Sequence, residues 1–271
     1  MPIRMALYGV IYLTALAFAT PGRAAAEGPY PIWWSAELGL DSLDHVERRL
    51  RRALWLDYSG GFPLFKGAPG NYETVTAHSC ESLFELTDKG YSAVTTNDLH
   101  AQNLLLSECR AIALLARAKP ARVSYLRDFV LNTGALDYLP ALVNLYPSCE
   151  FICYAVAANE RGIPFTKFET PLVVDVESDD EMTVWTTGWV LTLTVIGRGD
   201  VTGDGIDDML LLASGHATEG TLGAANFFVV TREMPGVVLR VIGAERELCP
   251  EYSCHPLPPD VAAYRDSSPP P

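Results

Sequence analysis

An aspartate- and glycine-rich stretch, Gly197–Leu212, limits what this chain can fold into more than any other part of the sequence. Its sequence is GRGDVTGDGIDDMLLL, with four aspartates within nine residues and an apolar run directly after them. Carboxylates crowded at close range repel one another unless opposite charge lies among them. Glycines at 203 and 205 let the chain turn sharply, because glycine adopts positive φ without steric cost. We therefore expect a tight turn between two strands that holds a cation.

The spacing of oxygen-bearing residues in this stretch matches a calcium loop. Five residues take loop positions 1, 3, 5, 7 and 9, the fourth through its backbone carbonyl: Asp200, Thr202, Asp204, Ile206 and Asp208. Hard oxygen ligands at this spacing favour Ca²⁺ over Zn²⁺ or Cu²⁺. Leu211 stands where an EF-hand has its glutamate, so the loop is not an EF-hand. An Asp- and Gly-rich turn without a metal is the alternative, since these residues dominate turns.

The segment GDVTGDGIDDMLLL resembles the calcium loop of the FG-GAP or VCBS-type repeat, which is found in integrin-alpha-like propellers and in many secreted bacterial proteins. In that family an aspartate and a second polar residue precede Gly-Asp-Gly, and a final aspartate enters an apolar strand. The resemblance covers about residues 191–230. It implies that Asp200, Thr202, Asp204 and Asp208 bind calcium and that Asp207 points outward. A propeller needs about 4–8 blades, and the chain has one such loop. We therefore expect a single calcium hairpin in a small sheet.

The chain is predicted to have an α+β fold with a helical N-terminal half and a mostly antiparallel, β-rich C-terminal half. Apolar residues at helical spacing predict helices over residues 41–56, 99–118, 123–132 and 135–146. Residues 150–158 fit a strand or a helix. Glycines and prolines predict a loop over 58–71, followed by a strand over 72–77. Alternation with a period of two predicts strands over 183–196, 208–213, 225–231 and 237–242.

Four regions are expected along the chain. Residues 1–26 have the basic, apolar and small-residue order of a signal peptide, and an uncleaved anchor is the alternative. Its apolar run of about 15 residues is shorter than the ~20 that a spanning helix needs. A mainly helical region over 27–162, a β-rich region with the calcium loop over 163–248 and a proline-rich tail over 249–271 follow. No later segment is long and apolar enough to enter a membrane, so we expect a periplasmic or secreted protein.

The six cysteines all follow the predicted signal peptide. An even number of cysteines in an oxidising compartment predicts disulfides, and six allow fifteen pairings. Pairing between neighbours in the sequence is favoured: Cys80 with Cys109, Cys149 with Cys153, and Cys249 with Cys254. A zinc site is the competing interpretation, but the chain has no C-x-x-C pair of the kind that such sites prefer.

Composition excludes some partners. The formal net charge is −13, and removal of residues 1–26 would take away two arginines and no acidic residue. Such a surface repels nucleic acid and anionic membranes, and it suits a cation or a basic protein partner.

The sequence favours a non-enzymatic protein. No G-x-S-x-G, H-E-x-x-H or phosphate-binding glycine loop is present. We expect an exported calcium-binding protein that binds or inhibits a protein partner. The alternative is a secreted hydrolase of cell-envelope polymers, which uses His78 or carboxylates of the acidic run Asp175–Glu181. Convergence of His78, His100, Glu73 and Asp98 in one cleft would favour the hydrolase. For the acidic run itself, a solvated loop is the simpler interpretation.

Overall fold

The computed structural model describes residues 27–38, 40, 42–43, 46–51, 60–146, 148–171 and 173–244. Its centre is a seven-stranded antiparallel sheet with the order β11-β10-β9-β8-β7-β6, in which β2 also pairs with β8. The strands of this sheet are β2 (Trp33–Trp34), β6 (Val173–Ser178), β7 (Glu181–Trp185), β8 (Trp189–Gly199), β9 (Asp208–Ala217), β10 (Gly223–Thr231) and β11 (Arg240–Ala244). β1 (Glu27–Tyr30) pairs separately with β5 (Ala121–Val123), and β3 (Phe62–Ala68) pairs with β4 (Asn71–Ala77).

Alternation along β8 divides the sheet into two faces. Leu191, Leu193 and Val195 are fully buried, while Thr192 and Thr194 between them are only half-buried. Successive side chains of a strand point to opposite faces, so one face carries a continuous apolar layer. The predicted strand over 183–196 is two strands, because residues 186–188 turn between β7 and β8.

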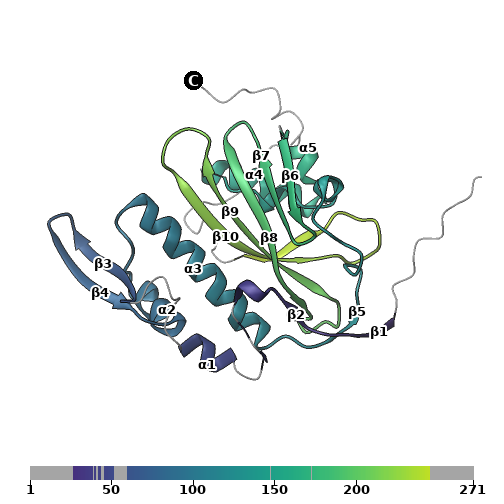
Figure 1. Ribbon diagram of the computed structural model, residues 1–271. Helices are drawn as coiled ribbons and strands as arrows, with labels where there is room; N and C mark the ends of the chain where they lie inside the picture. The colour runs from purple at the N-terminus through teal and green to yellow at the C-terminus, as the bar shows by residue number, and fades with distance from the viewer. Residues whose placement is uncertain are drawn as a thin grey trace, which may run out of the picture.

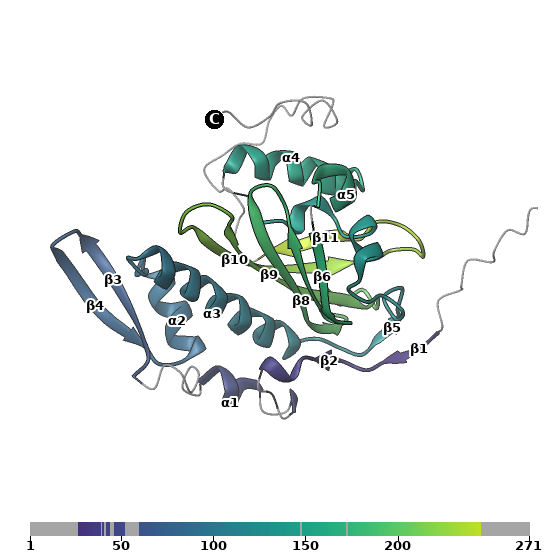
Figure 2. The ribbon, with the colours of Figure 1, turned by 45° about the horizontal axis from the view of Figure 1, so that its top comes forward.

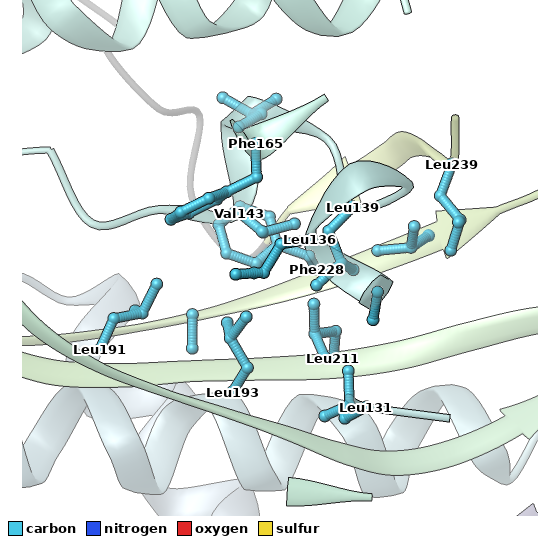
Figure 3. Close-up of a cluster of buried hydrophobic side chains, with 14 of the residues drawn as sticks. Leu131, Leu136, Leu139, Val143, Phe165, Leu191, Leu193, Leu211, Phe228 and Leu239 are labelled. Carbon is cyan, nitrogen blue, oxygen red and sulfur yellow. The ribbon is translucent and has the colours of Figure 1, made fainter. Parts of the chain in front are cut away.

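The apolar face is covered by short helices (Figures 1 and 2). These are η4 (Thr133–Asp137), η5 (Ala141–Val143), α4 (Cys149–Glu160) and α5 (Phe165–Phe168). Leu136, Val143 and Phe165 pack against Leu191 and other strand residues in the largest core cluster (Figure 3). The buried apolar area on this face is the main stabilising contribution to the C-terminal half.

The opposite face is covered over β10 and β9 by α3 (Thr96–Leu115) (Figure 1). The Thr95 hydroxyl accepts the Asp98 N–H at 3.1 Å and caps this helix. Ile112 and Leu115 pack in a second cluster with Phe227 and other sheet residues. The helix predicted over residues 99–118 is therefore confirmed, with its start three residues earlier.

A smaller cluster joins α3 to the hairpin β3–β4 and to α2 (Cys80–Asp88). Ser79 caps α2 in a capping box with Ser82. Cys80 and Cys109 form a disulfide that links α2 to α3, as predicted. Cys149 and Cys153 are also disulfide-bonded, and their pairing with each other stays a prediction. The pair Cys249–Cys254 lies outside the described residues.

The prediction of a helical N-terminal half is wrong. Strands make up 36% of the residues that the structure describes and helices 30%. The region before residue 124 contributes five strands of its own, β1 to β5. The chain is therefore mostly β, with its antiparallel seven-stranded sheet in the C-terminal half.

Two predicted helices, over 123–132 and 135–146, are replaced by β5, irregular chain with a turn at residues 127–128, and the short helices η4 and η5. Arg198 on β8 explains part of the difference. Its guanidinium donates to the carbonyls of Leu126 and Phe129 at 2.7 and 2.8 Å. A carbonyl in a helix interior accepts from the residue four positions later, so these bonds hold the segment in another conformation.

Other boundaries also differ from the predictions. The predicted loop over 58–71 contains β3, whose pairing with β4 supplies the backbone hydrogen bonds that a loop would lack. The acidic run predicted to be a solvated loop contains the last four residues of β6 and the first residue of β7. Of the helix predicted over 41–56, residues 46–51 are helical as α1 (Val46–Arg51). The predicted signal peptide and the proline-rich tail lie outside the described residues. Within the described parts of the chain, no helix has the length and apolar character to cross a membrane.

Candidate metal centre

The aspartate-rich stretch forms the connection between β8 and β9, as the sequence predicts. Gly203 and Gly205 have φ values of 84° and 90°. These values are in the left-handed region, which a glycine adopts without strain. The two glycines thus allow the chain to reverse between β8 and β9, and the carboxylates of Asp200 and Asp208 stand at the two ends of the turn.

Asp200, at the first ligand position, is 5% exposed, and both its carboxylate and its backbone are hydrogen-bonded. Its Oδ1 accepts the Gly203 N–H at 2.6 Å, and its Oδ2 accepts the Gly205 N–H at 3.0 Å. Its backbone N–H and carbonyl both pair with Lys119, at 2.9 and 3.0 Å. This network aims backbone N–H dipoles at the carboxylate, which stabilises its charge.

Asp208, at the last ligand position, is completely buried. Its Oδ2 accepts three hydrogen bonds of 3.2 Å, from the N–H groups of Val201 and Thr202 and from the Thr202 hydroxyl. Its Oδ1 is buried and accepts no hydrogen bond of good geometry, although the Thr231 hydroxyl, which is likewise buried without a well-formed hydrogen bond, lies beside this carboxylate. Burial raises the pKa of Asp208, the hydroxyls of Thr231 and Thr202 lower it, and the charge of Asp204 raises it again. One oxygen of this carboxylate is thus left without full compensation.

The remaining predicted ligands are placed around the same turn. Asp204 is exposed, and its Oδ1 accepts the Ile206 N–H at 2.7 Å. Ile206 is half-buried and pairs with Val123 in a parallel bridge. Thr202 is exposed and has its hydroxyl bonded to Asp208. The structure therefore brings the five predicted ligands into one turn.

The carboxylates of the turn bind backbone N–H groups in this conformation. Across the described residues, no three His, Cys, Asp or Glu side chains form a group that could hold a metal ion. The donor set nevertheless fits a hard cation, since it consists of carboxylate, hydroxyl and carbonyl oxygens. The buried Oδ1 of Asp208, with the neutral Thr231 hydroxyl beside the carboxylate, is an oxygen of this set at which a cation would compensate the charge.

Asp207 does not point outward, contrary to what the resemblance implies. It is 5% exposed, and its carboxylate accepts the Ser124 hydroxyl at 2.8 Å. Burial raises the pKa of Asp207, and Ser124 and the Arg198 charge act in the opposite direction. The reason is topological: the segment after α3 lies against the turn, so a side chain that faces away from the ligand positions meets protein.

The sequence analysis does not predict that this segment, residues 119–124, contacts the turn. The N–H groups of Arg122 and Val123 both donate to the Gly205 carbonyl, and the Asp207 N–H donates to the Val123 carbonyl. Arg122 also donates from Nη2 to the Asp204 carbonyl at 3.3 Å. A Cβ on Gly205 would lie 2.6 Å from the Arg122 guanidinium, so a larger residue there would displace this side chain as well as strain φ. Arg122 and Asp204 are 82 residues apart in the sequence, so no local sequence pattern predicts their contact.

The four residues of the hydrolase alternative have separate surroundings. Asp98 accepts the Thr95 hydroxyl at the start of α3, and a hydrogen bond with Glu73 raises the pKa of Tyr91. His78 is exposed just after β4, whereas His100 packs over Gly223 of β10. None of the contacts among the described residues joins any two of the four. The structure therefore gives the hydrolase alternative no catalytic cluster.

His100 predicts a pH dependence of stability. Burial lowers the pKa of His100, and the neighbouring His216 lowers it further. The unfolded chain then binds a proton more readily than the folded protein, so stability falls as pH drops through about 6.5. Between about pH 7.5 and pH 5.5, the free energy of unfolding measured in urea is expected to fall less for His100→Gln than for the parent. His78→Gln, at an exposed position, is the control and is expected to lose as much as the parent. An equal fall in the free energy of unfolding for all three proteins would contradict the assignment of this pH dependence to His100.

No family model matches the chain, and neither among curated proteins nor among solved structures is there a significant match. The resemblance to the FG-GAP or VCBS-type repeat therefore rests on the residues of the turn and stays a prediction.

Proposed function

We propose that this chain is an exported calcium-binding protein that acts by binding a protein partner and not by catalysis. The observation that supports the calcium assignment is the carboxylate of Asp208, which is fully buried and whose Oδ1 accepts no well-formed hydrogen bond, with the neutral Thr231 hydroxyl beside the carboxylate. A buried carboxylate that the protein compensates on one side only is costly. The turn has five oxygen ligands at calcium-loop spacing, and a cation bound among them would remove this energetic cost.

Calcium would be held by side-chain oxygens of Asp200, Thr202, Asp204 and Asp208 and by the carbonyl of Ile206. The ion would supply positive charge to a turn whose ligand carboxylates are bonded to backbone N–H groups and hydroxyls, with the guanidinium of Arg122 at its edge. The affinity of extracellular calcium modules is about 10⁻⁴–10⁻³ M, and a loop of this kind without the bidentate glutamate belongs in that range.

A structural effect follows from the contacts of the turn. Residues 119–124 bind the turn through Lys119, Arg122 and Val123, and β5 of this segment pairs with β1. An ion that fixes the turn therefore also fixes the β1–β5 pair against the end of the seven-stranded sheet. The calcium ion is in this account a structural element that stabilises the protein, with the partner bound elsewhere.

Partner binding is supported by charge and by the distribution of catalytic residue types. The net charge of −13 suits a basic protein. The histidines and carboxylates proposed for a hydrolase lie in separate surroundings, so the hydrolase alternative has no observation in its favour. Export by the predicted signal peptide would bring the protein to the periplasm or outside the cell.

Thermal unfolding tests the calcium assignment. Saturating calcium is expected to stabilise the parent by about 2–3 kcal/mol at roughly 100 times Kd, which raises Tm by about 5–10 °C. Asp204→Ala removes one ligand and is expected to lose most of this shift. Asp179→Ala removes an exposed carboxylate of the β6–β7 turn and is the matched control, with a full shift expected. An equal shift in all three proteins, or none in the parent, would refute the site.

A further inference from the structure

β6 is an edge strand of the seven-stranded sheet, and no strand among the described residues pairs with its outer side. It is the last strand in the order β11-β10-β9-β8-β7-β6, and no isolated bridge involves it. It lies at the margin of the sheet in Figure 1. An edge strand presents a row of backbone N–H and carbonyl groups that can pair with another extended chain.

The side chains of β6 are unusually open for a strand of this sheet. Val173 is 57% exposed and Val176 is 41% exposed, and every residue from Asp175 to Ser178 is exposed. Val173 and Asp175 share a face with Trp185 and Thr183 of β7, which lie directly opposite them and are half-buried. The edge therefore offers apolar surface as well as backbone groups.

The charge on this edge has a single sign. Asp175 and Glu177 are the charged residues of β6, and neither belongs to an ion pair with any described residue. Negative charges directly opposite one another across a strand pair are unfavourable, whereas opposite charges are favourable. The acidic edge therefore disfavours pairing with a second copy of β6 and favours a strand that carries Lys or Arg.

We infer that the outer edge of β6 is the docking site for a basic, extended segment of the protein partner, which adds to the sheet as a further antiparallel or parallel strand. This inference rests on the partner-binding half of the proposed function. Backbone hydrogen bonds supply the affinity of such strand addition and alternate side chains supply its specificity. The partner's cationic side chains lie on the face of Asp175 and Glu177, and its apolar ones lie on the opposite face beside Val176.

A peptide titration tests the inference with the full mature protein. The probe is a capped nonapeptide of alternating lysine and valine, and its counterpart has glutamate in place of each lysine. Saturable binding of the lysine peptide is expected, with the largest amide chemical-shift changes in Val173–Ser178. Binding is expected to weaken with added salt and to be absent for the glutamate peptide.

Two double variants with equal charge change complete the test. Asp175→Lys/Glu177→Lys is expected to weaken binding at least about tenfold, because each reversed charge repels the probe. Asp88→Lys/Glu160→Lys changes exposed carboxylates on α2 and α4 and is expected to change it by less than about twofold. Equal losses in both variants, or shifts centred away from β6, would overturn the inference. Self-association of the parent that the β6 variant alters would also overturn it, in favour of a second copy.

The titration is repeated in calcium and in chelator. Loss of peptide binding with an intact calcium shift in Tm counts against the β6 edge alone. Peptide binding without any calcium shift counts against the metal site alone, so the two failures are distinguishable.

Discussion

Replacement of both Cys80 and Cys109 by alanine is expected to lower the free energy of unfolding by about 3–4 kcal/mol. The two residues are 29 positions apart, and a bridge across a loop of that length restricts the unfolded chain strongly in the chain-entropy model. Equilibrium unfolding in urea measures the effect. The bridge also lies within the cluster that joins α2 and the hairpin β3–β4 to α3. Without the bridge, α2 and this hairpin are expected to unfold before the rest of the protein.

A second variant separates the bond from the packing of its atoms. Cys80 and Cys109 are 4% and 0% exposed, so alanine also leaves a small cavity. Replacing both by valine restores apolar volume without the bond, and most of the loss is expected to persist. A loss below about 1 kcal/mol in the valine variant would show that the covalent link contributes little.

Asp208→Asn is expected to stabilise the protein in chelator and to abolish its response to calcium. The raised pKa of Asp208 means that its ionised form is disfavoured in the folded state. An asparagine carries no charge, and its carbonyl can still accept from Val201 and Thr202. We expect a gain of about 1–3 kcal/mol at neutral pH, the range for an uncompensated buried polar group, measured by unfolding in urea with chelator present.

The pH dependence of this gain has a definite sign. A carboxyl whose pKa is raised by folding contributes stability that is present below its ordinary pKa, 3.8 for Asp208, and is lost as pH rises through the folded value. The Asn variant therefore exceeds the parent at neutral pH, and the difference shrinks as pH falls toward about 4. A variant that is less stable than the parent at neutral pH would contradict this account of Asp208.

Asp207→Asn is the matched control for the neighbouring residue. Asp207 is also buried with a raised pKa, but it accepts from Ser124 and lies near the Arg198 charge. Arg198 keeps its hydrogen bonds to the carbonyls of Leu126 and Phe129 in this variant. An intact calcium response is therefore expected for Asp207→Asn, in contrast to Asp208→Asn.

The sequence predicted the elements whose stabilising contacts are local or periodic. The alternation in β8 and the apolar stripe of α3 both report burial directly, because side chains repeat on one face with the period of the element. The bridge between Cys80 and Cys109 was predicted from the even number of cysteines and from the preference for pairing between neighbours in the sequence. These features need no information about distant residues.

The missed elements depend on distant partners. Residues 123–146 have helical spacing, but Arg198 binds the carbonyls of Leu126 and Phe129 from β8. β3 contains glycine and proline and becomes a strand through pairing with β4. β6 carries acidic residues that are typical of loops, and the sheet extends onto it all the same. Tertiary pairing overrides local propensity in each case.

The candidate site divides in the same way. The five ligand positions follow one another closely in the sequence, so their spacing alone located the turn. The inward orientation of Asp207 and the contact of Arg122 with Gly205 come from a segment far earlier in the chain. Their partners become visible only when β5 is placed beside the turn.

An amide NMR titration with calcium is the most direct measurement of the central claim. The N–H groups of Gly203, Gly205 and Ile206 donate to carboxylates that calcium would bind, so their resonances report on the site. The account predicts that they shift most, with saturation at about 10⁻⁴–10⁻³ M calcium. Shifts that do not saturate, or that are no larger than those of the acidic strand β6, would show that the aspartate turn binds no calcium.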